Sequence, residues 1–141
     1  MAGALTFAKS DDGLSTIEDG VTRHAWAWTS DASGDVSGIS VTITPGTIVA
    51  VTFLPGAGGS QPTNLYDVTL MCDEHGPDVL NDEGLNLSNT AGSHHAVFIY
   101  NSDKTAHFRQ WMHGGGYTLN VANAGASKSG TMALFQYRGV L

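Results

Sequence analysis

Six histidines and one cysteine are the side chains of this sequence best suited to bind a transition-metal ion, and the cysteine could also act as a nucleophile. They are His24, His75, His94, His95, His107, His113 and Cys72. His94 and His95 are adjacent, so in a strand they point to opposite faces and do not readily share one metal ion. No HxH or HExxH motif occurs, and no Cys–His spacing is typical of a zinc site. We therefore predict no metal site and no cofactor, and interpret the histidines as ordinary surface or interface residues.

The densest polar cluster is Asp73-Glu74-His75-Gly76. A carboxylate beside a histidine is suited to acid–base chemistry. Asp and Gly also favour turns, and we predict that this run is a turn closing the strand that ends near Cys72. Asp78 and Asp82 extend the acidic patch, and a weak Ca²⁺ site stays open as an alternative although the EF-hand spacing is absent. Cys72 continues a strand pattern and is predicted to be buried, because a reactive thiol requires a basic neighbour.

Two glycine-rich segments do not match the catalytic loops that they resemble. The segment 55–60 lacks the Gly-Lys-Ser/Thr ending of a phosphate-binding loop, and no helix pattern follows it. The segment 113–116, His-Gly-Gly-Gly, is similar to the oxyanion loop of some lipases, but the sequence has no Gly-x-Ser-x-Gly nucleophile elbow. We predict no catalytic residues and a protein that is not an enzyme.

Trp26 and Trp28 lie two residues apart, and in a strand they share one face, which His24 continues. Core packing is one interpretation of this face. The other is an aromatic contact surface for a protein partner or for stacking on sugars. We predict an interface formed by Leu5 and Phe7 in the N-terminal segment together with His24, Trp26 and Trp28.

The elements that must position these residues are strands, because hydrophobic residues recur with a period of two. The clearest case is Ile39, Val41 and Ile43, which alternate with Ser and Thr. The stretch 48–54 is apolar on both faces and is predicted to be a central, covered strand. Further strands are predicted at 21–29, 66–72, 96–100, 105–111, 117–121 and 131–137. The best helical segment, 78–85, is weakened by Gly84.

Short strands at intervals of about 10 to 16 residues, separated by Gly, Asn, Asp and Ser, are typical of a sandwich, jelly roll or barrel. We predict an all-β protein: a single-domain, jelly-roll-like β-sandwich with about 8–10 short strands. Residues 1–16 are predicted to form an N-terminal arm, and residues 17–141 the sandwich domain.

The amino-acid composition makes some classes of binding partner unsuitable for this protein. Only 13% of the 141 residues are charged, and the formal net charge is −7 with six Lys and Arg in all. These basic residues are scattered, so binding to nucleic acid or to an anionic membrane is not expected. No apolar run reaches transmembrane length, and the first ten residues do not resemble a signal peptide. A single cysteine excludes an internal disulfide, and we expect a protein made in a reducing cytoplasm.

The central third of the chain carries a family resemblance. The run Gln-Pro-Thr-Asn-Leu-Tyr-Asp-Val-Thr-Leu at 61–70, followed by Asp-Glu-His-Gly at 73–76, Asp-Val-Leu at 78–80 and Asn-Leu-Ser at 86–88, resembles small virion proteins of tailed bacteriophages. In size and character the chain is similar to the capsid cement, or decoration, proteins of short-tailed phages. The resemblance covers about residues 45–100.

That resemblance implies a jelly-roll protein without catalytic residues, which binds the outside of the capsid and clamps neighbouring major capsid subunits. It implies assembly in the host cytoplasm, a place on the virion surface, and self-association as a homodimer rather than a trimer. A tail or head–tail structural protein and a carbohydrate-binding β-sandwich are the alternatives. A cupin-like metal enzyme using His94, His95 and His107 is the enzymatic alternative.

Overall fold

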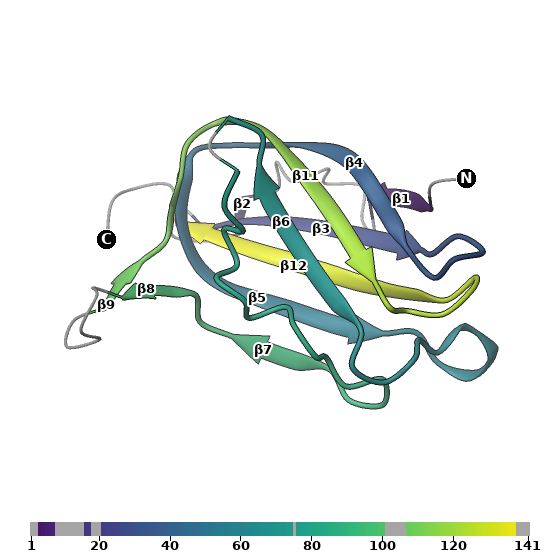
Figure 1. The fold of residues 1–141 in the computed structure, drawn as a ribbon. Helices are drawn as coiled ribbons and strands as arrows, with labels where there is room; N and C mark the ends of the chain where they lie inside the picture. The colour runs from purple at the N-terminus through teal and green to yellow at the C-terminus, as the bar shows by residue number, and fades with distance from the viewer. Residues whose placement is uncertain (1–2, 8–15, 18–20, 75, 101–106, 138–141) are drawn as a thin grey trace.

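The computed structural model describes residues 3–7, 16–17, 21–74, 76–100 and 107–137, which form a β-sandwich of two antiparallel sheets (Figure 1). The strands are β1 (Ala4–Phe7), β2 (Thr16–Ile17), β3 (Val21–Thr29), β4 (Val36–Ile43), β5 (Gly46–Pro55), β6 (Asp67–Cys72), β7 (Ser93–His95), β8 (Phe98–Tyr100), β9 (His107–Arg109), β10 (Trp111–Met112), β11 (Gly115–Ala122) and β12 (Ser129–Tyr137). The prediction of an all-β sandwich is confirmed.

The strands within the described ranges outnumber the 8–10 expected from the sequence. Five of these strands are short: β2 and β10 have two residues each, and β7, β8 and β9 have three each. An alternating pattern needs about four residues before it can be recognised in a sequence. Strands this short are therefore defined by their pairing partners rather than by a local pattern.

The larger sheet has the order β1-β3-β12-β5-β10, with β2 paired to β3 and β7 paired to β5. β12 lies in the middle and pairs with β3 along its whole length, from Ser129↔Thr29 to Tyr137↔Val21. Its other edge pairs with β5, with one register shift after Phe135. β5 has partners on both edges, so the prediction of a central strand in this region is confirmed.

The smaller sheet has the order β4-β11-β6 and faces the larger one (Figure 1). Its strands follow the predicted alternation: in β6 the side chains of Val68, Leu70 and Cys72 are buried, and those between them are half-buried. In β11 the buried positions are Tyr117, Leu119 and Val121. One face of this sheet therefore packs into the core, and the other face carries mostly polar residues.

The core fills the space between the two sheets. Trp26, Met132 and Phe53 lie side by side on β3, β12 and β5, and Leu70 and Leu119 lie side by side on β6 and β11. Each of these side chains is at most 2% exposed. Burial of a large apolar side chain contributes about 2 kcal/mol, so this layer is the main source of stability.

Residues 78–87 run along the free edge of β6 as a series of turns, so the segment 78–85, the best helical candidate of the sequence, is not a helix. Asn81 and Asp82 have φ values of 50° and 67°, which end any right-handed helix at that point. Isolated bridges join Met71 to Asp78 and Tyr66 to Leu87. The segment is thus fixed to β6 at both of its ends.

Gly84 lies at the closest approach of this segment to β6. Its carbonyl oxygen accepts a hydrogen bond of 2.7 Å from the backbone N–H of Val68, and a Cβ at position 84 would overlap the carbonyl oxygen of Val68. We expect Gly84→Ala to lower the free energy of unfolding by about 2 kcal/mol, because the segment must move away from β6. Urea unfolding followed by tryptophan fluorescence measures the change.

Gly59→Ala is the matched control for that substitution. A Cβ at position 59 meets no heavy atom within 4 Å. We expect this variant to stay within about 0.5 kcal/mol of the wild type. Equal losses for the two variants would show that close packing at Gly84 is not the cause.

The N-terminal segment lies on the outer edge of the larger sheet. β1 pairs antiparallel with the end of β3, in the register Leu5↔Trp28 and Phe7↔Trp26, and β2 pairs with the start of β3. The described part of the predicted arm is therefore an edge strand, and the boundary predicted after residue 16 stays a prediction.

Candidate functional site

Three of the five predicted interface residues lie inside the sandwich. His24, Trp26 and Trp28 are each 1% exposed. The ring of Trp26 stacks on that of His24 at 5.8 Å, and Trp28 contacts the ring of Tyr66 at 5.5 Å. The core interpretation therefore holds for this face of β3, and in the folded chain it offers no surface to a protein or a sugar.

His24 is accommodated in the core by a polar network. Its Nε2 lies 2.8 Å from Oε1 of Gln136 and 3.3 Å from Oγ1 of Thr44. The amide nitrogen of Gln136 donates to the carbonyl oxygen of Thr44 at 3.2 Å and contacts Sδ of Met112 at 3.4 Å. A buried polar group costs little when its hydrogen bonds are made inside the protein.

The other two predicted interface residues, Leu5 and Phe7, lie on β1. Their backbones pair with Trp28 and Trp26 on β3. Their side chains lie outside the part of the structure that is described. The arm is therefore placed at an open sheet edge, and the contacts of these two side chains stay a prediction.

Other apolar side chains are exposed. Leu54 is 59% exposed, Leu65 54%, Trp111 44% and Leu85 38%. Trp111 belongs to β10, close in sequence to the β8–β9 strand pair, which lies beyond the ends of the two sheets (Figure 1). The sequence did not distinguish Trp111 from the other two tryptophans, because a two-residue strand shows no alternation.

The β8–β9 pair carries an ordered cation–π contact. The guanidinium carbon of Arg109 lies 4.8 Å from the ring centre of Phe98, and Nη1 of Arg109 donates to the carbonyl oxygen of Val49 at 2.8 Å. The second contact ties β9 to β5. Trp and Arg held in fixed positions are the residue types that contribute most to protein–protein binding.

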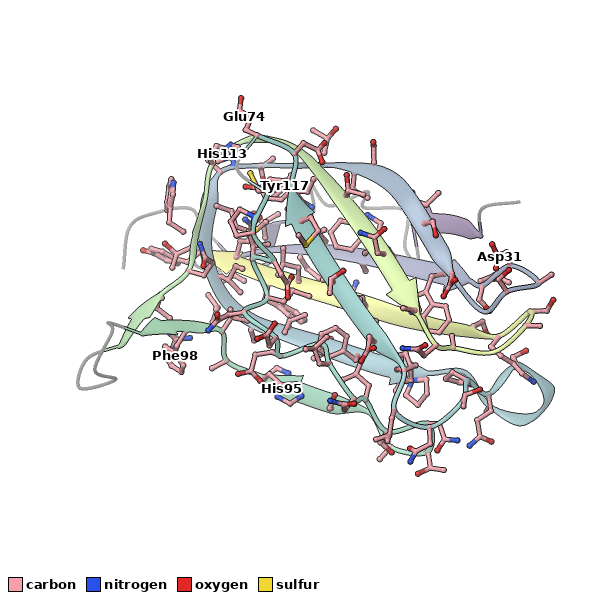
Figure 2. The ribbon with its side chains drawn as sticks, viewed as in Figure 1. Asp31, Glu74, His95, Phe98, His113 and Tyr117 are labelled. Carbon is pink, nitrogen blue, oxygen red and sulfur yellow. The ribbon has the colours of Figure 1, made fainter. Side chains whose placement is uncertain are left out.

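A thiol–imidazole pair lies at one end of the smaller sheet. Sγ of Cys72 is 3.1 Å from Nε2 of His113. Cys72 ends β6 and is paired with Tyr117 of β11, so the register of these two strands brings the loop before β11 over the thiol. Figure 2 shows His113, Glu74 and Tyr117 together at this end of the sandwich.

The orientation of the His113 ring is fixed by its surroundings. Nδ1 lies 2.9 Å from the carbonyl oxygen of Gly114, which only accepts, so Nδ1 carries a proton and donates it. The ring packs on that of Tyr117 at 5.6 Å, and the Tyr117 hydroxyl donates to the backbone carbonyl of His113 at 2.9 Å. Nε2 is thereby directed at the sulfur of Cys72.

The electrostatics of the pair favour a charged imidazole. The hydrogen bond to the Gly114 carbonyl and the one to Cys72 raise the pKa of His113 above its ordinary value, and partial burial opposes them. Oε2 of Glu74, 3.8 Å from Nε2, acts in the same direction. The pKa of Tyr117 is raised to about 12, chiefly by burial, so its hydroxyl stays a donor.

This pair is the site that the sequence analysis missed. Cys72 is buried, as predicted. Its thiol nevertheless has a basic neighbour, His113, which the sequence around Cys72 does not indicate. The two residues are 41 positions apart, and no motif spans them. The turn predicted after Cys72 is present at Asp73 and Glu74.

Across the described ranges, no group of three or more His, Cys, Asp or Glu side chains is arranged to hold a metal ion. The carboxylate of Asp78 accepts hydrogen bonds from the backbone N–H groups of Leu70, Leu80 and Asp82, which gives it a structural role. His95 pairs with Glu83 at 3.1 Å. The described part of the chain contains no long apolar helix that could span a membrane.

Comparisons of the chain with protein-family models, with curated proteins and with solved structures found no match.

Proposed function

We propose that the protein is a non-enzymatic structural protein of a tailed-phage virion, which binds the outside of the capsid and cements neighbouring major capsid subunits. The resemblance of residues 61–88 to small virion proteins suggested this role. A tail or head–tail position in the virion is the alternative, and a carbohydrate-binding module is the alternative outside the virion.

The observation that carries the proposal is the edge position of the N-terminal strand. Ala4–Phe7 pair with one edge of β3, while the other edge of β3 is paired with β12 along its full length. The central strand pairing of the larger sheet is therefore complete without β1. An extended arm of this kind can form the same backbone hydrogen bonds with the edge strand of a sheet in another protein chain. Such strand addition is a common way for two chains to bind.

Exposed apolar groups support a protein partner. Trp111 is exposed and lies two residues after Arg109, whose contact with Phe98 ties β9 to β8. Figure 1 shows β8 and β9 at one end of the molecule. Trp and Arg are the residue types that contribute most to protein–protein binding when they lie at the centre of an interface. We place the capsid contacts of the domain here, in addition to those of the arm.

The charge of the chain agrees with a position outside the capsid. A net charge of −7 repels packaged DNA, and a low content of charged residues favours close protein–protein packing. A protein that binds only the expanded shell stabilises that shell by mass action. A homodimer would double the number of capsid contacts per particle.

Co-sedimentation with empty, expanded heads of the phage, with unexpanded heads as a control, tests the function. We expect saturable binding of the wild type at a fixed ratio to capsid subunits. Deletion of residues 1–7 is expected to weaken binding by about tenfold or more, because strand addition by the arm is lost. Trp111→Ala, which changes an exposed residue, is expected to weaken it by a similar factor.

Each outcome has a definite meaning. Failure of the wild type to bind either shell would overturn the cement function and favour a tail protein, or a glycan binder if a glycan array is positive. Full binding by a folded deletion variant would be compatible with the cement function. It would contradict the proposed contribution of the arm to binding. Sedimentation equilibrium of the free protein tests the expected dimer, and a trimer or monomer would contradict it.

A further inference from the structure

The Cys72–His113 pair carries chemistry that the proposed shell binding does not use. Its Sγ–Nε2 distance of 3.1 Å is a hydrogen-bond length for sulfur, and Nδ1 is already committed to the Gly114 carbonyl. Nε2 therefore has two states available. It accepts the S–H proton of a neutral thiol, or it donates its own proton to a thiolate.

The surroundings favour the second state. An adjacent imidazolium stabilises a thiolate, which is the form of cysteine that reacts. Among the residues that the structure describes, the charged and titratable groups near the His113 ring are Cys72, the Glu74 carboxylate at 3.8 Å and the Tyr117 hydroxyl group, with Asp73 on the same turn as Glu74. Glu74 favours the imidazolium, Tyr117 is neutral at ordinary pH, and Asp73 accepts a hydrogen bond from Thr118.

Access to the sulfur is narrow. Cys72 is 4% exposed, and the His113 side chain beside it is 34% exposed. His113 lies in the loop before β11, at the surface beside the sulfur. Small hydroperoxides are therefore better suited to this position than bulky electrophiles.

We propose that Cys72 is a site of covalent modification by small hydroperoxides, with His113 as the residue that positions and activates the thiolate. The sulfur of Cys72 attacks the terminal O–H oxygen of the hydroperoxide, an S–O bond forms and the O–O bond breaks. The leaving hydroxide or alkoxide takes the proton from Nε2 of His113. Sulfur is oxidised by two electrons to a sulfenic acid, and the hydroperoxide is reduced to water or an alcohol.

The test is the rate at which hydrogen peroxide forms a sulfenic acid in the folded protein as a function of pH. At each time point the peroxide is removed with catalase, the chain is unfolded in urea with dimedone, and the trapped sulfenic acid is measured by intact mass. Cys72 is the only cysteine of the sequence, so one adduct identifies the site, and oxidised methionines are not trapped. At pH 6 we expect the wild type to react about tenfold faster than His113→Gln. The rate for the variant should rise with pH through the ordinary thiol value of about 8.5.

His94→Gln is the matched control, because it changes an exposed histidine on β7 outside the pair, and it should react like the wild type. Urea-unfolded wild type supplies the pH profile of an ordinary thiol and keeps the test valid if His113→Gln does not fold. The absence of an adduct in the folded protein at every pH would overturn the proposal. Identical pH profiles for folded and unfolded protein would overturn it as well.

Discussion

Replacing Trp26 with alanine is expected to lower the free energy of unfolding by about 4 kcal/mol. The side chain is 1% exposed and lies between Met132 on β12 and the ring of His24, which stacks on it. Its removal leaves a cavity at the centre of the larger sheet, and the flanking strands cannot close it without breaking their register. Urea unfolding monitored by circular dichroism measures the loss.

Trp111→Ala is the matched control for this prediction. It removes the same side chain from a site that is 44% exposed, and we expect a loss of about 1 kcal/mol or less. The two variants separate stability from binding, because Trp111 is the tryptophan that we place in the capsid contact. Similar losses from both substitutions would contradict the assignment of Trp26 to the core.

The burial of Trp26 and Trp28 could not be predicted from the sequence. A period of two places Trp26 and Trp28 on one face of a strand, but it does not say whether that face is covered. His24 on the same face favoured an edge, because an isolated histidine is poorly suited to a core. Its hydrogen-bond partner, Gln136, is 112 residues away, and only the β3–β12 register brings the two together.

The strands themselves could be predicted, because alternation is a local property of the chain. The predicted strand at 21–29 has the bounds of β3, and the strand at 66–72 differs from β6 by one residue. The predicted strand at 105–111 is divided into β9 and β10, since Gln110 leaves the ladder, and its carbonyl accepts from the backbone N–H of Ile48. This division depends on pairing with β5, so the local sequence of the segment does not indicate it.

The thiol–imidazole pair could not be predicted for the same reason. Cys72 and His113 meet because β11 pairs with β6 in one register, with Tyr117 opposite Cys72. A shift by one residue would move every side chain of β11 to the other face. Residue types alone gave two correct facts, a buried cysteine and a turn after it, and the contact required the sheet.

Replacing Asp78 with alanine is expected to lower the free energy of unfolding by about 3 kcal/mol. Oδ1 of Asp78 accepts from the backbone N–H groups of Leu70 and Leu80, at 3.0 and 3.2 Å, and Oδ2 accepts from that of Asp82 at 3.2 Å. Leu70 and Leu80 are buried, so their N–H groups would lose a partner away from water. Chemical unfolding at pH 7 measures the loss, and Glu74→Ala, which removes an exposed carboxylate, should change stability by about 0.5 kcal/mol at most.

The same variant tests the direction of a pH effect. Burial raises the pKa of Asp78 above 3.8, and the three backbone hydrogen bonds only partly oppose it. A carboxyl group whose pKa is higher in the folded state binds its proton more tightly there, so its contribution to stability is largest below the unfolded pKa and falls as pH rises through the folded one. The stability difference between wild type and Asp78→Ala should therefore be larger at pH 3 than at pH 7. A difference that grows with pH would mean that the three hydrogen bonds outweigh burial at this carboxyl group.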